Sequence, residues 1–330
     1  MIPQRFRRDF LGFADSGVND ERRIHQTGIA SGGNSLTVAG GTMTVCITIT
    51  STKGGVGKTT LTASLGALLA DLGQQVLLVD ADPQPTLSSY YSLDVVAPHG
   101  LTDLMVAANT QATISTTSVE GLDLVYSDDP DGKLRDWIRD AVDGRVRLRH
   151  ILQRLDGLYD FILIDTQGAI GPLQDAAVAA ADLLLSPIPP EILSAREFVR
   201  GTVAMLDRLR PMAYLGAPIG PLRGVIYRQD RTVDARRIVE ELRSESALPS
   251  KGAITILDTV IPASVAYREA ATAKQPVHRL DSKRKGVSPC ALETLQALIQ
   301  ELFPHLKGLE KQIPRHRSSA ELTAADAGRR

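Results

Sequence analysis

The chain has 330 residues, of which 43% are hydrophobic and 23% are charged, and its formal net charge is −1. This is the composition of an ordinary soluble globular protein, long enough for one large α/β domain with additions or for two small domains. Its two cysteines, Cys46 and Cys290, exclude a disulfide framework and a multi-cysteine metal site. No apolar run of about 18 residues occurs, so no transmembrane helix is predicted.

The N-terminal segment, residues 1–42, differs from the rest of the chain. It is polar and shows no sustained hydrophobic period, so we expect a flexible extension. Its basic start is not followed by an apolar stretch, which excludes a secretory signal and indicates a cytoplasmic protein. Met43 directly precedes the first predicted strand, so Met1 and Met43 are both open as start sites.

A glycine-rich turn between a strand and a helix is the strongest feature of the sequence. Residues 43–50 are β-branched and alternating, which predicts a buried strand, and leucines at helical spacing predict a helix over 58–71. Backbone N–H groups and the positive end of the helix dipole converge on such a turn and bind phosphate. The residues that we assign to this phosphate loop are Lys53, Gly54, Gly55, Val56, Gly57, Lys58, Thr59 and Thr60. We expect Lys58 to reach the β- and γ-phosphates and the Thr59 hydroxyl to ligate Mg²⁺.

The start of the loop departs from the ordinary pattern. Thr52 stands where a glycine is usual, and Lys53 follows it. This second lysine adds a positive charge that has no role in a phosphate site built by one subunit. It is either a solvated loop residue or a residue that acts beyond its own subunit.

Two aspartates follow the second predicted strand, residues 75–80. Asp80 ends the strand, and Asp82 comes two residues later, beside prolines that end regular structure. Carboxylates at the C-terminal edge of a parallel strand lie where open α/β sheets bind ligands. A helix cap or a turn is the alternative for one of them and explains the pair less well.

A third strand, residues 159–166, is apolar and ends with Asp165. A strand of this form usually accompanies a phosphate loop, and we expect Asp165 to hold the hydration shell of Mg²⁺, directly or through water. The turn that follows, 167–172, is expected to be mobile and to sense the γ-phosphate.

The remaining elements alternate between helices and strands. After the second strand we expect a short helix over 102–108, a Thr/Ser-rich loop over 109–118, a strand over 122–126 and a helical segment over 130–157. Further strands are predicted at 182–188, 222–227, 254–257 and 260–262, and further helices at 191–209, 232–246 and 289–303. This alternation predicts an α/β fold, a doubly wound, mainly parallel sheet with helices on both faces. The domain is expected to span 43–305 and to be followed by a polar, disordered tail over 306–330.

Charge is unevenly placed along the chain. From Pro221 onward Lys and Arg outnumber Asp and Glu, with clusters that include Arg236, Arg237 and residues 283–285. A patch of this kind binds a polyanion, or it is a solvated face with scattered cations.

Together these motifs resemble the ParA-type partition ATPases, P-loop NTPases of the deviant Walker A group that includes Soj, MinD and the nitrogenase iron protein. Residues 53–60 match the signature loop of the group, 80–84 match the ParA switch I pattern, and 164–165 match its acidic strand. Residues 260–265, with 269–270 and 275–277, look like the late block of the family. The resemblance spans about 43–305.

The resemblance implies three catalytic residues. Lys53 would be the signature lysine, which reaches across an ATP-sandwich homodimer to the partner's phosphates and supplies charge in trans, as an arginine finger does. Lys58 would hold the β- and γ-phosphates together with the loop amides. Asp82 would orient the attacking water.

The same resemblance implies the metal and base contacts. Thr59, Asp80 and Asp165 would hold Mg²⁺ or its waters, and Pro262 would lie near the adenine of ATP. Hydrolysis would be slow, because the ATP-bound dimer is the working state and hydrolysis is its timer. A ParB-like centromere-binding protein would stimulate it, and the dimer would bind DNA non-specifically on the nucleoid, away from any membrane.

The chain departs from the family at two places. Residues 166–168 lack the prolines that often follow the acidic strand, and Ala263 and Ala266 stand where DNA-binding arginines can occur. The basic residues that remain as candidate DNA contacts are Arg231, Arg268, Lys283, Arg284 and Lys285.

The same ATPase core also fits other functions. A positioning or assembly ATPase that acts on a conjugation or secretion complex remains the alternative. A MinD-like membrane factor needs a basic amphipathic helix at its C-terminus, which residues 324–330 do not form. An iron–sulfur reductase needs cysteines on loops, whereas Cys46 lies in a predicted strand.

Overall fold

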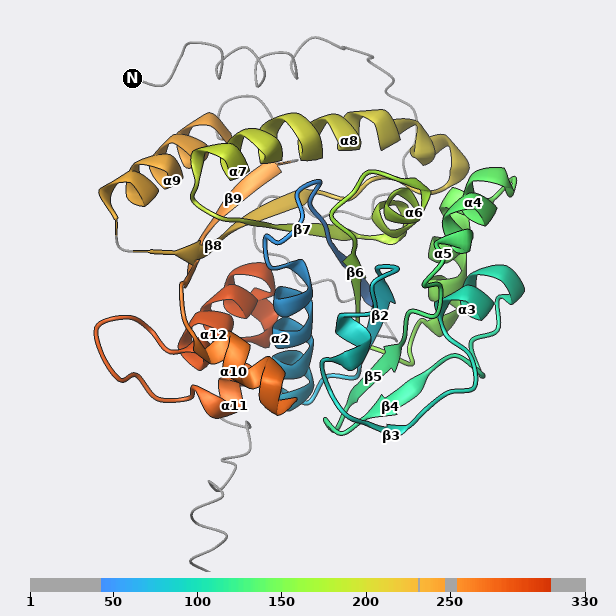
Figure 1. Ribbon diagram of the computed structural model, residues 1–330, viewed down its shortest axis with the longest axis horizontal. Coiled ribbons are helices and arrows are strands. Elements are labelled where there is room, and N and C mark those ends of the chain that lie inside the picture. Colours follow the sequence, from blue (N-terminus) through green and yellow to red (C-terminus); the bar gives the residue numbers. More distant parts are fainter. Residues whose placement is uncertain (1–42, 231, 247–253, 310–330) are drawn as a thin grey trace, which may run out of the picture.

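The computed structural model describes residues 43–230, 232–246 and 254–309 (Figure 1). The predicted extension over 1–42, the candidate DNA contact Arg231 and the tail beyond residue 309 lie outside the described residues. Within the described part, nine strands form one sheet in the order β3-β4-β5-β2-β6-β1-β7-β8-β9. Their bounds are β1 Val45–Ile49, β2 Val76–Ala81, β3 Leu93–Val95, β4 Ser115–Thr117, β5 Leu122–Val125, β6 Phe161–Thr166, β7 Leu183–Ile188, β8 Leu222–Gln229 and β9 Ile254–Pro262.

The strands from β5 to β9 in this order run parallel, and only β4 pairs antiparallel with its neighbours β3 and β5. The central strands β1, β2 and β6 are buried along nearly their whole length. The sequence of a parallel strand that is covered on both faces is a continuous apolar run, and for this reason these three strands could be predicted. The predicted doubly wound, mainly parallel sheet is confirmed.

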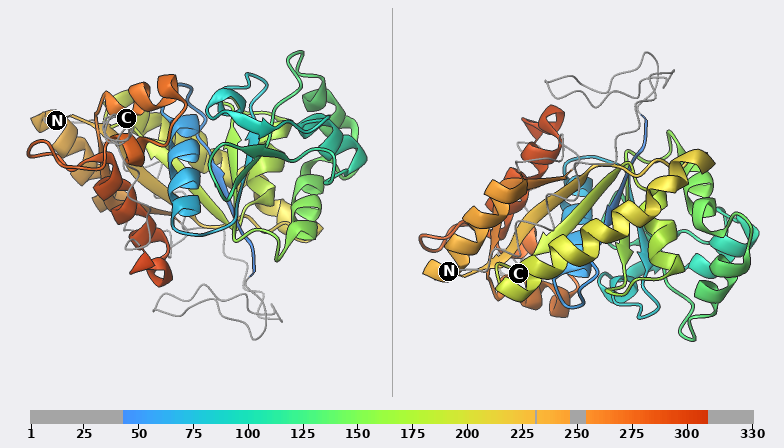
Figure 2. Two further views of the ribbon diagram at one scale, coloured as in Figure 1. Left: turned by 90° about the horizontal axis from the view of Figure 1, so that it is seen from below. Right: turned by 90° about the horizontal axis from the view of Figure 1, so that it is seen from above.

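Helices cover both faces of the sheet (Figure 2). One face carries α2 Lys58–Asp71, α10 Ala266–Ala273, α11 Val277–Leu280 and α12 Ala291–Leu302. The other carries α3 Leu101–Ala107, α4 Lys133–Asp140, α5 Gly144–Leu152, α6 Pro172–Ala180, α7 Ile192–Glu197, α8 Val203–Leu209 and α9 Val233–Ser246. Short 3-10 helices lie at η1 Leu87–Ser89, η2 Gln153–Leu155, η4 Arg210–Leu215 and η5 Pro304–Leu306. None of the helices in the described ranges is long and apolar enough to cross a membrane.

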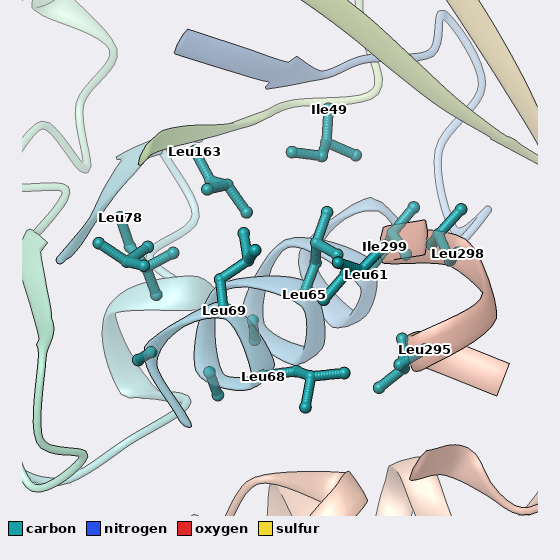
Figure 3. Close-up of a cluster of buried hydrophobic side chains, with 14 of the residues drawn as sticks. Ile49, Leu61, Leu65, Leu68, Leu69, Leu78, Leu163, Leu295, Leu298 and Ile299 are labelled. Carbon is teal, nitrogen blue, oxygen red and sulfur yellow. The ribbon is translucent and has the colours of Figure 1, made fainter. Parts of the chain in front are cut away.

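Helix α2 lies between the sheet and α12 and is buried almost all round. Figure 3 shows its leucines, from Leu61 to Leu69, between Ile49 and Leu163 of the sheet and Leu295 of α12. Gly66 permits this approach, because a Cβ there would lie 2.7 Å from a methyl carbon of Leu78. Burial of this kind stabilises by about 25 cal/mol for each Å² of apolar surface. The helix therefore fixes its N-terminus, and the loop before it, at the edge of the sheet.

The segment 109–118 is not only a loop, as was expected, because it contains strand β4, which pairs with β3 and β5. Its inward side chains are polar but buried: Ser115 and Thr117 are at most 3% exposed. Ser115 Oγ accepts the Ala97 N–H at 2.9 Å, and Thr117 Oγ1 donates to the Leu122 carbonyl at 2.7 Å. Hydroxyls that satisfy local backbone groups remove the apolar alternation from which strands are predicted.

Two helical segments are less continuous than predicted. Residues 130–157 break between α4 and α5, where Ala141 is extended and Gly144 approaches Ile138 so closely that a Cβ would lie 2.1 Å from its carbonyl oxygen. Residues 191–209 contain a π-helical turn, η3 Phe198–Thr202, between α7 and α8. At the other end of the chain, Leu306 is 5% exposed and packs in the core, so the folded chain continues beyond residue 305.

Candidate nucleotide-binding site

The phosphate loop crosses the C-terminal edge of the sheet between β1 and α2. Gly55 has a φ of 71° and Gly57 a φ of 101°, in the left-handed region that favours glycine. Gly57 also has no room for a side chain, because a Cβ would lie 2.1 Å from Cε1 of Tyr227. No side chain of the described residues caps α2, so its first N–H groups are free to bind an anion.

Lys58 lies at the first position of α2 and is 6% exposed. Its ammonium donates to the Lys53 carbonyl at 3.5 Å. Burial lowers the pKa of Lys58, whereas the charges of Asp165 and Asp82 raise it. The lysine is thus held inside the loop, beside the two carboxylates that the sequence had assigned to the metal and to water.

Asp80 and Asp165 lie side by side on neighbouring strands, as register partners of β2 and β6. Both are fully buried. Neither oxygen of Asp165 has a hydrogen-bond partner in the described part of the chain. Burial raises the pKa of Asp165 to about 8; the Thr59 hydroxyl, which is nearby but makes no hydrogen bond of standard geometry, lowers it, and Asp80 raises it.

The two aspartates are not equivalent. Asp80 Oδ2 accepts two hydrogen bonds from Ser88, and Oδ1 accepts the Asp82 N–H at 3.3 Å. Burial raises the pKa of Asp80 to about 6, although the hydrogen bonds from Ser88 and Asp82 lower it. An unpartnered buried carboxylate next to a threonine hydroxyl is the oxygen donor set that Mg²⁺ prefers, so the residues fit this metal, with Asp165 as the better ligand.

Asp82 lies on the loop after β2, is partly exposed, and accepts the Gln84 N–H at 3.0 Å. Across the loop, Gly168 of the turn 167–172 packs directly on the phosphate loop, since a Cβ there would lie 2.5 Å from Cα of Gly54. The structure therefore brings Asp82, Lys58, Asp165 and the predicted γ-phosphate turn to one place.

Lys53 contacts a segment that sequence reasoning missed. Its ammonium donates to Ser194 Oγ at 2.8 Å and lies 3.8 Å from Glu191 Oε2. The preceding Thr52 donates to Glu197 Oε1 at 2.8 Å. No motif marks Glu191, Ser194 or Glu197, although the strand–helix junction before α7 faces the loop.

A cavity of about 350 Å³ lies beside Lys53. Its wall includes the loop from Lys53 to Val56, Glu191 and Arg228. Arg228 has a φ of 58°, which is rare for a residue with a side chain, and its guanidinium donates to the Gly55 carbonyl at 3.4 Å. The sequence indicated Arg228 only as a member of a basic cluster with Arg223 and Arg231, and its contact with Gly55 places it beside the phosphate loop.

The other predicted site residues lie elsewhere. Pro262 ends β9 and is the register partner of Gln229, one residue beyond Arg228. Arg268 lies on α10 beside Val265 and Glu269. Residues 283–285 are exposed between α11 and α12, where Arg284 pairs with Glu293 at 2.9 Å.

Comparison with known proteins agrees with this geometry. A family model described as an AAA domain matches residues 44–210. The chromosome-partitioning ATPase Soj of Treponema pallidum is 32% identical over 238 residues, which is 71% of this chain and 89% of that protein. The chain belongs to the ParA family of partition ATPases. ParA of Caulobacter vibrioides is 29% identical over 246 residues, covering 73% of this chain and 88% of that protein.

Solved structures share the ParA fold. An McdA–ATP complex from Cyanothece has a TM-score of 0.64 at 21% identity and covers 83% of this chain and 97% of that chain. MinD of Pyrococcus furiosus has a TM-score of 0.58 at 22% identity, and the match covers 80% of this chain and 100% of that chain. At these identities the likeness concerns the fold alone. For this ParA-family chain, the P-loop site described above is that of an ATP hydrolase.

Proposed function

We propose that this chain is the ATPase of a DNA partition system, which dimerises on ATP, binds DNA non-specifically and hydrolyses ATP when a ParB-like centromere-binding protein stimulates it. The observation on which the proposal depends is the position of Lys53. A lysine at the start of a phosphate loop, beside a cavity and partly exposed, can serve a second subunit.

The nucleotide chemistry follows from the residues at the sheet edge. Lys58 and the loop N–H groups hold the phosphates of ATP, and Thr59 with Asp165 holds Mg²⁺, whose charge offsets that of the phosphates. Asp80 would support the hydration shell of the metal. Asp82 is exposed enough to meet the attacking water and to orient it.

Dimerisation is supported by the surface around the cavity. Leu193 and Val233, next to residues that line it, are 66% and 76% exposed, and Ile170 on the turn beside Gly54 is 59% exposed. Exposed apolar side chains grouped around a polar site favour an interface. A partner subunit placed here would receive Lys53 and exclude water from the phosphates.

Non-specific DNA binding is supported by the exposed cations of the C-terminal part. Lys283 and Lys285 lie on an exposed segment, and Arg268 lies on α10. Arg284 is partly neutralised by Glu293, so it contributes less. Phosphate contacts of this kind need no base recognition, which suits a protein that coats the nucleoid.

The test is DNA binding by the full chain with ATP, with ADP and without nucleotide, using duplexes of random sequence. Binding that requires ATP and falls by about 10³-fold or more between low and moderate salt supports partition, since a decrease of that size corresponds to about six phosphate contacts. The double change Lys283→Ala and Lys285→Ala should weaken it, whereas Lys133→Ala, an exposed lysine on α4, should not. An ATP-dependent dimer without DNA affinity contradicts partition and favours an assembly ATPase.

A further inference from the structure

Ser88 connects three segments beneath the nucleotide site. Its hydroxyl donates to Asp80 Oδ2 at 2.6 Å, and its N–H donates to the same oxygen at 2.8 Å. The hydroxyl also accepts the Ser127 N–H at 2.9 Å. The end of β2, the helix η1 and the chain after β5 therefore meet at one side-chain oxygen.

The Asp80 carboxylate, which is bound by Ser88, also binds the loop that carries Asp82. Oδ1 of Asp80 accepts the Asp82 N–H, and Asp80 is fully buried. Leu87, next to Ser88, is 1% exposed and anchors η1 in the core. The short loop between β2 and η1 is thus tied at both ends, and the orientation of Asp80 determines where the backbone of Asp82 lies.

We propose that Ser88 is a positioning residue for ATP hydrolysis, which acts through Asp80 to hold the Asp82 carboxylate where the attacking water binds. The inference rests on the proposed function, in which Asp82 orients that water. Hydrogen bonds to a carboxylate are about twice as strong as neutral ones, so the loss of the hydroxyl removes one strong bond to Asp80 Oδ2, leaves only the Ser88 N–H on that oxygen among the bonds described above, and loosens the carboxylate. A displacement of about 1 Å at a reacting group can cost about 10²-fold in rate.

Ser88 acts on the chemical step and not on nucleotide affinity. It belongs to neither the phosphate loop nor the wall of the cavity beside Lys53. A hydroxyl that only satisfied a buried carboxylate would change the stability of the protein and leave the kinetics of the folded fraction as they were. The kcat of a folded Ser88 variant therefore distinguishes the two roles: it falls if Ser88 positions Asp82 and is unchanged if Ser88 is only structural.

The first measurement is steady-state hydrolysis by the full chain. Ser88→Ala is expected to lower kcat by about 10-fold, with KM for ATP within about twofold. Ser88→Thr retains the hydroxyl and should have the kcat of the wild type, whereas Ser88→Val, in which a methyl group replaces the hydroxyl of threonine, should have a lowered kcat. If Ser88→Ala does not fold, the comparison of Ser88→Thr with Ser88→Val takes its place. Ser89→Ala is the matched control, because the Ser89 hydroxyl donates to the Thr86 carbonyl at 3.0 Å in an exposed position and not to Asp80.

The second measurement is a double-mutant cycle in single-turnover hydrolysis. If Ser88 acts through Asp82, then Ser88→Ala has no further effect in the Asp82→Ala background. Additive losses, or an unchanged kcat in a folded Ser88→Ala protein, overturn the positioning role while leaving the proposed ATPase function in place. A wild-type chain that binds no ATP and hydrolyses none overturns both.

Discussion

The Lys53 ammonium and the Ser194 hydroxyl form a hydrogen bond of 2.8 Å within one chain, and Ser194 donates in turn to Glu191 at 3.3 Å. The lysine side chain is 35% exposed and that of Glu191 is 69% exposed. Partly exposed contacts of this kind contribute about 0–1 kcal/mol, because water screens them. Lys53 can therefore leave this position for the phosphates of a second subunit at small cost.

Lys53→Ala is expected to keep ATP binding and to lose ATP-dependent dimerisation. Lys58 and the loop N–H groups remain in place, but the charge that would cross the interface is removed. Binding of a fluorescent ATP analogue and light scattering with ATP measure the two properties. Lys133→Ala, whose side chain is 82% exposed and pairs with Asp131, should behave as wild type. Normal dimerisation of Lys53→Ala would rule out its role in trans.

Gly57→Ala is expected to abolish ATP binding and to destabilise the fold. The new Cβ would collide with the Tyr227 ring, and the φ of 101° would be strained for alanine. Gly157→Ala is the matched control: its φ is 80°, but no atom lies within 4 Å of the added carbon. The control should cost about 1–2 kcal/mol from strain alone, and Gly57→Ala clearly more, by urea unfolding. Equal losses of unfolding free energy in the two variants would show that the Tyr227 ring moves aside and that the collision costs nothing.

Asp165 should make the nucleotide-free protein less stable as pH rises. Its pKa is about 8 in the folded chain against an ordinary value of 3.8, so the folded state binds the proton more tightly than the unfolded state. Its contribution to stability is therefore fully present below about pH 4, decreases between about pH 4 and 8, and is constant above. Asp80, with a pKa of about 6, contributes a decrease in stability of the same sign between about pH 4 and 6.

The measurement for Asp165 is the urea midpoint from pH 5 to 9 without nucleotide. Asp165→Asn should flatten most of the decrease, whereas Asp136→Asn, at a side chain that is 47% exposed, should retain it. Mg²⁺ and ATP should also flatten it, because the metal binds the charged carboxylate. The same steep decrease in Asp165→Asn would assign the proton to another group.

Asp71→Asn is expected to destabilise the protein by about 3 kcal/mol, because it removes the carboxylate that pairs with the Arg279 guanidinium in a largely buried position. Asp71 ends α2, its side chain is 5% exposed, and its carboxylate accepts hydrogen bonds from Arg279 and from His278 of α11. Burial alone would raise the pKa of Asp71, but Arg279 and then His278 hold it well below its ordinary value. This contribution is present above about pH 4 and is lost as pH falls.

The control for Asp71 is again the exposed Asp136→Asn, which should change the free energy of unfolding by less than about 0.5 kcal/mol. Urea unfolding at pH 7 and pH 3 compares the two variants. Because Asp71 lies at the far end of α2 from the phosphate loop, ATP affinity should stay within about twofold in the folded protein. A loss of ATP affinity at unchanged stability would contradict a purely structural role.

The phosphate loop and the ends of β2 and β6 were predictable because their signals are local. Residues 53–60 carry glycines at the positions where the chain has positive φ, and Asp165 follows a continuous apolar strand. Parallel strands meet the ligand at one edge, so the order of strand and acidic residue was enough to bring Asp80 and Asp165 together. Strand β4 was missed because its buried side chains carry hydroxyls.

By itself, the sequence determined that this chain binds a nucleotide phosphate, at which loop, and on which kind of sheet, since glycine conformation and hydrophobic period act over a few residues. Only the tertiary structure decided where Lys53 rests, because Ser194 lies 141 residues away along the chain. It likewise separated the two aspartates, since Asp80 is bound to Ser88 whereas the oxygens of Asp165 have no hydrogen-bond partner among the described residues. Such contacts depend on how distant segments pack, and no local pattern encodes them.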